Sequence, residues 1–415
     1  MPRGSNLPAI GSYNRSVVLD AVRRSAGLSR TEVAEVTGLT AQTVGKVTRQ
    51  LLEEGLLAET GVVVNGRGKP RTSLELASPG RLAVGVHVDP AVMTHVLLDL
   101  RGRVVARAQA RTPSSSQPDV VVAEVAQGVR ELVARAEVDA AQLLGVGIAV
   151  PGPVDVAAGA VLAPPNLPRW RHVPLRDALG EATGLPVALE KDVTAAAVAE
   201  LWMNSSPQPR NLAYLYYGTG FGAGLVLGDE VVRGAGSNGG NIGHLTVDPA
   251  GPLCSCGRHG CLGVLVTPAA LVREATDAGV RLDDGDSVAS GDQVDDLRRV
   301  EVQLHRLARR ASSGDRAARD VLGRAAERIA RAVVLLANLL DIDEVVLGGP
   351  FWQPVAGSVL ADLPGLVAES RALISTHPVR FRSSEVGEDT AAVGAACVVL
   401  DTALSPRPSS LLITP

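Results

Sequence analysis

The chain has 415 residues, of which 46% are hydrophobic, 20% charged and 2% aromatic. This composition is typical of a soluble globular protein with two or three domains. It contains no apolar run long enough to span a bilayer and no signal-peptide core, so we expect a cytoplasmic protein without a membrane partner. The net charge is −4, yet residues 1–80 hold 10 Lys and Arg against 7 Asp and Glu. This basic start is a weak indication of nucleic-acid binding.

Three helices are predicted near the N-terminus. The first is expected to begin at a cap formed by Ser12 or Asn14. A capping-box pair, Ser29 and Glu32, starts the second helix, which ends before Gly38, and the third follows directly. Two helices joined by a short turn that contains glycine are typical of a helix-turn-helix.

In a helix-turn-helix, the first turns of the later helix enter the major groove of DNA. Gln and Thr side chains can read base edges there, and a Lys can contact a phosphate. The candidate DNA-binding residues of this helix are Ala41, Gln42, Thr43 and Lys46. The alternative is an ordinary packing unit of three helices without a nucleic-acid partner.

Apolar and polar residues alternate over residues 56–77, as in the strands of a β-hairpin, and the predicted tip is glycine-rich and basic. Cations at such a tip suit the negative potential of a narrow minor groove. A basic tip alone is more often a solvated turn, but after a helix-turn-helix it is typical of a wing. We therefore predict a winged helix-turn-helix over residues 1–80, with wing contacts from Arg67, Gly68, Lys69 and Arg71.

From Arg81 onward the sequence alternates between strands and helices. Strand triplets, glycine-rich turns and intervening helices predict an α/β protein of two lobes with a cleft between them. Residues 281–296 and 405–415 are expected to be loop or disordered.

Several motifs of this part resemble the ROK family of repressors, open reading frames and sugar kinases. The matching segments are VPGPVD, PNLPRW, EKDVTAAAVAEL, GTGFGAG, the His and Cys cluster described next, VVLGG and AAVGAA. The resemblance implies an actin-like, ribonuclease-H-like sugar-kinase fold after the winged helix-turn-helix. It places the first lobe at residues 81–200, completed by a C-terminal helix around 388–402. The second lobe, with an oligomerisation surface, is expected at residues 201–387, and a tail at 403–415.

One histidine and three of the four cysteines fall within 18 residues: His244, Cys254, Cys256 and Cys261. Thiols stay reduced in the cytoplasm, which argues against disulfides. Zinc favours thiolate and imidazole ligands, and four protein ligands make a closed structural site, so we predict one structural zinc per chain. His259 is an alternative ligand, but the family histidine matches His244, which the resemblance places beside a bound sugar. Buried free cysteines are the alternative to a metal.

The resemblance also indicates what a kinase would need and what this chain lacks. Family kinases hold ATP phosphates with an Asp-x-Gly-Gly-Thr turn, where this chain has residues 87–91, including Asp89. A carboxylate at this position repels phosphate. Asp192 matches the family's general base, and a second glycine-rich turn at 218–222 is retained. We therefore expect no catalysis.

The expected effector-binding residues are Gly152, Asn166, Lys191, Asp192, Asn241 and His244. In the family, three pocket positions hold Asn, Glu and Glu, and this chain has Lys191, Asn241 and Gly263 there. The loss of two carboxylate acceptors and the gain of a cation disfavour binding of an ordinary neutral hexose. An acidic or phosphorylated sugar would suit Lys191. The alternatives are that Lys191 pairs with Glu190 or Asp192, or that the pocket binds nothing.

The sequence thus predicts a regulator of transcription that binds a double-stranded DNA operator. We expect a repressor of carbohydrate-related genes that responds to a sugar or sugar derivative and forms a homodimer or homotetramer. The rival interpretations are an ATP-dependent sugar kinase fused to a DNA-binding head, and a DNA-binding regulator whose body has lost effector binding.

Overall fold

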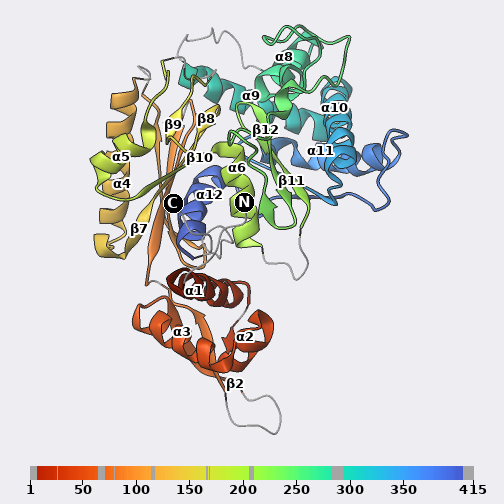
Figure 1. Ribbon diagram of the computed structural model, residues 1–415. Helices are drawn as coiled ribbons and strands as arrows, with labels where there is room; N and C mark the ends of the chain where they lie inside the picture. The colour runs from red at the N-terminus through yellow and green to blue at the C-terminus, as the bar shows by residue number, and fades with distance from the viewer. Residues whose placement is uncertain are drawn as a thin grey trace.

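The computed structural model describes residues 7–25, 27–63, 71–78, 80–90, 92–113, 117–164, 167, 169–204, 210–282 and 293–404. A small N-terminal part, here called the head (residues 7–78), lies against one end of a larger body of two lobes (Figure 1). Among the described helices, none is both long enough and apolar enough to cross a membrane.

The head consists of three helices and a small antiparallel sheet. Its elements are α1 (Leu7–Arg23), α2 (Arg30–Thr37), α3 (Ala41–Glu53) and the sheet β1 (Leu28–Ser29), β3 (Arg71–Leu76) and β2 (Leu57–Val63), in the order β1-β3-β2. The capping box of Ser29 and Glu32 is confirmed, and Gly38 ends α2 in the left-handed conformation, with φ at 68°. Thr40 caps α3 by accepting a hydrogen bond from the backbone N–H of Thr43.

The predicted start of the first helix is wrong, because α1 begins at Leu7 rather than at Ser12 or Asn14. Ser12 is exposed within the helix. Serine is tolerated on the exposed face of a helix, so Ser12 does not mark a helix start.

The first lobe is built on a five-stranded sheet in the order β10-β7-β4-β5-β6. The strands are β4 (Leu82–Val88), β5 (Val92–Asp99), β6 (Val104–Arg111), β7 (Leu143–Val150) and β10 (Val187–Lys191). Helices α4 (Pro118–Arg135) and α5 (Leu175–Thr183) pack on one face. Every residue of β4 is buried, as in a strand covered on both faces. A small hairpin, β8 (Val154–Asp155) and β9 (Ala160–Val161), and a 3₁₀ turn, η1 (Ala140–Gln142), complete the lobe.

The second lobe is built on a second five-stranded sheet, in the order β13-β12-β11-β14-β15. Its strands are β11 (Leu212–Tyr217), β12 (Phe221–Leu227), β13 (Glu230–Val231), β14 (Glu344–Gly348) and β15 (Arg380–Ser383). Its helices are η2 (Ile242–His244), α7 (Leu262–Val266), α8 (Pro268–Asp277), α9 (Gln293–Ser312), α10 (Arg316–Leu340) and α11 (Trp352–Ala368). Alternate residues of β11 face opposite cores: Leu215 lies in the cluster with α10 and α11, and Tyr214 in the cluster with α6.

Two helices lie between the sheets, α6 (Asp192–Met203) and α12 (Thr390–Leu404) (Figure 1). They approach each other and the first sheet so closely that only glycine fits at the contacts. A Cβ atom on Gly394 would overlap the carbonyl oxygen of Ala195, and one on Gly147 would overlap the carbonyl oxygen of Ala395. The Ala- and Gly-rich composition is therefore what permits these layers to pack.

The head is packed onto the body through α1. The guanidinium of Arg23 lies 4.2 Å from the ring centroid of Trp202 and donates to the Trp202 carbonyl oxygen at 3.2 Å. Arg24 pairs with Asp229 of the second lobe at 3.2 Å. One hydrophobic cluster contains Leu19 of α1 together with Trp202 and residues of α12. The head and the body therefore share a core.

Three boundaries expected from the sequence differ from those in the structure. Helix α6 continues to Met203, past the expected lobe boundary at residue 200. Helix α12 ends at Leu404, so residues 403 and 404 of the expected tail are helical, and residues 405–415 lie outside the described residues. Of the stretch 281–296, residues 293–296 belong to α9, and residues 283–292 lie outside the described residues.

A core shared by the head and the body predicts that the two parts unfold together. Trp202 is 6% exposed, so Trp202→Ala should destabilise the protein by about 3–5 kcal/mol. It should also split unfolding into two calorimetric transitions, because the head loses its main body contact. Met203→Ala is the matched control, since Met203 is 38% exposed on the same helical turn, and it should leave one transition. Retention of a single transition in Trp202→Ala would contradict a shared core.

Candidate functional site

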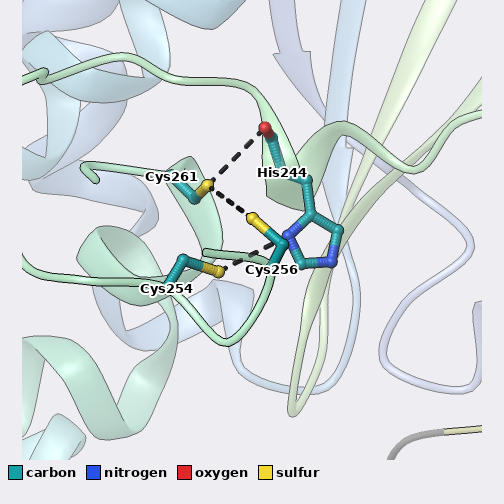
Figure 2. Close-up of side chains that lie close together, drawn as sticks. All are labelled: His244, Cys254, Cys256 and Cys261. Atoms are coloured by element: carbon teal, nitrogen blue, oxygen red, sulfur yellow. Dashed lines mark hydrogen bonds between the residues drawn. The ribbon is translucent and has the colours of Figure 1, made fainter. Parts of the chain in front are cut away.

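The predicted metal ligands lie together in the structure. The four ligand atoms of His244, Cys254, Cys256 and Cys261 are all within 4.8 Å of one another. His244 Nδ1 is 3.5 Å from the sulfur of Cys254, and the sulfurs of Cys256 and Cys261 are 3.5 Å apart. Figure 2 shows the four side chains converging from η2 and from the loop that precedes α7.

The two distances of 3.5 Å match the separation of ligands around a tetrahedral zinc. Zinc–sulfur and zinc–nitrogen bonds of about 2.0–2.3 Å put tetrahedral ligands roughly 3.3–3.8 Å apart. A disulfide needs sulfurs about 2 Å apart, and all four cysteines are free thiols. A backbone hydrogen bond from Arg258 lowers the pKa of Cys256 to about 6, which favours its thiolate, whereas burial raises the pKa of Cys261 to about 11.

The turn between the ligands depends on glycine, as expected. Gly257 and Gly260 both have positive φ, at 83° and 64°. A Cβ atom on Gly260 would overlap the carbonyl oxygen of Asp248. The alternative ligand His259 lies outside the group, with its Nδ1 3.0 Å from the carbonyl oxygen of Gly251. The structure therefore supports His244 as the fourth ligand.

Four of the six expected effector-binding residues line one cavity of about 130 Å³, here called the Asp192 cavity. The sequence-predicted members are Gly152, Lys191, Asp192 and Asn241, and sequence reasoning did not expect Tyr216 as part of this wall. Asn241 also lines a neighbouring cavity of about 260 Å³ that contains His244. Asn166 lies outside the described residues.

Lys191 is buried in the Asp192 cavity, with only 3% of its surface exposed. Its ammonium donates to Asn241 Oδ1 at 2.6 Å and to the carbonyl oxygens of Gly239 at 2.9 Å and Asn238 at 3.4 Å. Neither Glu190 nor Asp192, the two partners suggested by the sequence, accepts these hydrogen bonds. Glu190 instead pairs with Arg233 at 2.7 Å.

Burial shifts the ionisation of the groups around this cavity. It raises the pKa of Asp192 to about 6 and lowers the pKa of Lys191. It also lowers the pKa of His87, near the end of β4, to about 4. A nearby carboxylate, Asp89, contributes to the raised pKa of Asp192 and accepts a hydrogen bond from Thr219 at 3.4 Å. The segment after β4 and the glycine-rich turn at 218–222 thus meet through a carboxylate.

The candidate DNA-binding residues lie on the outer surface of α3. Ala41, Gln42 and Lys46 are exposed, and Thr43 is partly buried. Sequence reasoning missed Arg49, which is also exposed and lines a groove between α1 and α3 with Gln42 and Lys46. Spacing could have found it, because positions 42, 46 and 49 recur every three or four residues and so share one helical face. We call Gln42, Lys46 and Arg49 the α3 face.

The expected wing residues fall mostly outside the described part of the chain. Arg67, Gly68 and Lys69 lie there, and Arg71 begins β3. The strands that flank this segment, β2 and β3, pair antiparallel from Leu57–Leu76 to Val63–Arg71. The hairpin predicted over residues 56–77 is therefore present up to its tip.

A family model described as the ROK family matches residues 83–402. The chain belongs to the ROK family. The match covers both lobes, and the mixed α/β architecture agrees with the sugar-kinase fold that the sequence motifs implied. Three of the expected family motifs, VPGPVD, EKDVTAAAVAEL and GTGFGAG, line the Asp192 cavity, and the His and Cys motif forms the cluster of candidate metal ligands.

Two relatives and one solved structure extend this result. The chain is 26% identical over 403 residues to a putative xylose repressor of Caldicellulosiruptor sp. strain Rt8B.4, covering 96% of this ROK chain and 98% of that protein. It is 27% identical over 321 residues to a glucokinase of Halalkalibacterium halodurans, covering 77% and 95%. The fold matches the crystal structure of a ROK family transcriptional regulator, a homologue of the Escherichia coli MLC protein, with a TM-score of 0.74, 22% identity, and coverage of 95% and 98%.

The raised pKa of Asp192 makes stability depend on pH. The folded state holds this proton up to pH about 6, above the ordinary value of 3.8, so folding loses stability as the pH rises from 4 to 7. Asp192→Asn removes the charge, and should stabilise the protein by about 1–3 kcal/mol above pH 7 but not at pH 4. Urea unfolding across this range measures the difference. Asp177→Asn, at a surface carboxylate paired with Arg176, is the control. If the gain in unfolding free energy for Asp192→Asn did not vary with pH, burial would not raise the pKa of this carboxyl group.

Proposed function

We propose that this ROK protein is a sugar-responsive regulator of transcription, acting as a repressor of carbohydrate-related genes. The observation that carries the proposal is the α3 face, a polar and basic helical surface on a head that shares a core with a ROK body. The head has the helices of a helix-turn-helix followed by a β-hairpin, which supports a winged helix-turn-helix that binds double-stranded DNA. The full-length similarity to a putative xylose repressor supports the same function.

The cavity chemistry supports sensing rather than catalysis. Asp192 is retained at the matched position of a kinase base, and similarity to a glucokinase explains its presence. However, Asp89 faces the remaining phosphate turn through Thr219, and a carboxylate there repels ATP phosphates. Asp192 then serves as a hydrogen-bond acceptor for an effector hydroxyl, and the protein is not an enzyme.

Helix α6 offers the route from effector to head. Its first residue, Asp192, lines the cavity, and Trp202 in its last turn contacts Arg23 of the head. Between them, Glu200 is fully buried and pairs with Arg382 of the second lobe at 2.6 Å. A small movement of α6 on effector binding would reorient the head relative to the lobes. In a cytoplasmic homodimer or homotetramer, this would change the spacing of the DNA-binding helices.

The metal cluster is proposed to hold one structural zinc per chain. Three thiolates and one imidazole fill all four zinc positions and leave none for a substrate. The ion would tie the loop that carries Cys254 and Cys256 to η2, and so fix the backbone on both sides of His244. It supplies folding free energy and no reaction chemistry.

The α3 face predicts two separable effects on DNA binding. Gln42→Ala should relax preference at one or two base pairs, at a cost of about 1–3 kcal/mol. Lys46→Ala should instead weaken binding to all sequences and reduce the salt slope by about 1, because one fewer phosphate is neutralised. Arg316→Ala, at an arginine whose side chain is 94% exposed on the body, is the charge control and should change neither.

Titrations of an operator fragment at several salt concentrations measure both effects. Unchanged base preference in Gln42→Ala together with an unchanged salt slope in Lys46→Ala would refute the assignment of the α3 face to DNA.

The zinc proposal predicts about one zinc per freshly purified chain by elemental analysis. Cys256 is exposed, so Cys256→Ser removes little packing; any loss of stability should come from the lost metal. The variant should contain no zinc and melt at a lower temperature, and a chelator should bring the wild type to the same temperature. Cys397→Ala, at the cysteine outside the cluster, should keep its zinc. Zinc-free wild-type protein would end the proposal.

A further inference from the structure

The cysteines of the metal cluster differ in their access to solvent, a difference that matters once the proposed zinc is bound. Cys256 is exposed, whereas Cys254 and Cys261 are buried, with 5% and 0% of their surfaces exposed. Zinc holds its cysteine ligands as thiolates, and the thiolate is the form that reacts with oxidants. Because susceptibility to oxidation also follows exposure, an oxidant dissolved in water reaches Cys256 first.

A second thiol lies beside the exposed one. The sulfur of Cys261 is 3.5 Å from that of Cys256, whereas the sulfur of Cys254 is 3.5 Å from Nδ1 of His244 (Figure 2). A disulfide joins sulfurs about 2 Å apart, so the sulfurs of Cys256 and Cys261 would need to approach by about 1.5 Å. An exposed thiol next to a second thiol that can resolve its oxidation is typical of a redox-sensitive site.

The backbone around Cys261 is held in place, so the approach would fall to Cys256. Cys261 forms an isolated β-bridge with Thr246 and is the last residue before α7. The N–H of Leu262 donates to the carbonyl oxygen of Leu245 at 2.8 Å. These contacts tie the Cys261 end of the loop to the segment that follows η2.

Cys256 lies at the tip of the ligand loop, where the chain has room to move. The Cys254 N–H donates to the Arg258 carbonyl oxygen at 2.8 Å, and the Gly257 N–H donates to the Cys254 carbonyl oxygen at 2.9 Å, which closes the tip on itself. Residues 255–259 are all exposed. No described atom lies within 4 Å of the place that a Cβ atom on Gly257 would take. The tip can therefore shift toward Cys261.

A disulfide between Cys256 and Cys261 would take two of the four ligands away from the zinc. The two that remain, His244 and Cys254, are too few for a structural site, which uses four protein ligands. His244 and Cys254 also line the cavity of about 260 Å³ beside the Asp192 cavity. Release of the ion would therefore change the wall next to the candidate effector site.

We propose that the metal cluster is a site of reversible oxidation by hydrogen peroxide, with Cys256 as the thiol attacked first and Cys261 as its disulfide partner. The Cys256 thiolate attacks one peroxide oxygen, the O–O bond breaks, and a sulfenic acid and a hydroxide ion form. The Cys261 thiolate attacks that sulfur, the S–S bond forms, and a second hydroxide ion leaves. The two cysteines lose two electrons, hydrogen peroxide gains them, and Zn²⁺ passes into solution. This inference rests on the proposed zinc.

The test starts from full-length, zinc-loaded protein treated with hydrogen peroxide. A chromophoric zinc chelator records release of the ion, and differential alkylation with peptide mass mapping identifies the thiols that are lost. We expect release of about one zinc per chain together with a disulfide between Cys256 and Cys261. A reducing agent followed by zinc chloride should restore the original zinc content. Cys397→Ala, at the cysteine outside the cluster, should release zinc at the wild-type rate.

Cys256→His is the matched variant, because it keeps four zinc-binding side chains and removes the exposed thiol. It should release zinc about tenfold more slowly than the wild type at the same peroxide concentration. Should this variant fail to hold zinc, the disulfide map of the oxidised wild type decides alone which two cysteines are joined.

Three results would overturn the proposal: zinc that stays bound under peroxide, a disulfide that joins a different pair of cysteines, or equally fast release from Cys256→His. Zinc content is measured before oxidation, and a zinc-free wild type would refute both the zinc and its oxidative release. Operator binding by the reduced protein is measured on the same preparations. Its absence would refute the proposed regulator and not the oxidation site.

Discussion

The close packing of α6 is the constraint on which the rest of the molecule depends. This helix lies between the two sheets, and its alanines let α12 approach until a Cβ atom on Gly394 would overlap the backbone at Ala195. Side chains that project from α6 reach all other parts: Asp192 lines the cavity, Glu200 contacts the partly buried Arg382 and the buried Ser384, and Trp202 contacts the head. Because a packed interior transmits displacement rather than absorbing it, α6 cannot move without moving one of these contacts.

The Asp192 cavity lies next to the cluster of candidate metal ligands. Asn241 lines both the Asp192 cavity and the cavity that contains His244. Three residues along the chain, the imidazole of His244 faces the sulfur of Cys254. The short segment 241–244 is thus joined to Lys191 through Asn241 and to the His and Cys cluster through His244. An effector that displaced this segment would have to disturb both the Lys191–Asn241 hydrogen bond and the contact of His244 with Cys254. The position of η2 is therefore suited to respond to effector binding.

Much of this architecture could be predicted from the sequence, because its signals are local or tied to family motifs. The capping box of Ser29 and Glu32 and the paired strands of the hairpin are confirmed, and the four candidate metal ligands lie together as their spacing predicted. What failed depended on three-dimensional surroundings. The partners of Lys191 come from a loop almost 50 residues away, so charge alone suggested an anionic ligand. Tyr216 alternates along a buried strand, and nothing local distinguishes the tyrosine that faces a cavity from one that faces a core.

The central claim is that the head reads DNA while the ROK body controls it. The most direct measurement is selection of binding sites from a random DNA pool by the purified full-length protein. The account predicts enrichment of one motif with two half-sites whose centres are separated by one helical turn, about 10 base pairs, or a multiple of it. A pool that shows no enrichment over successive rounds, at a salt concentration where non-specific binding is weak, would contradict it.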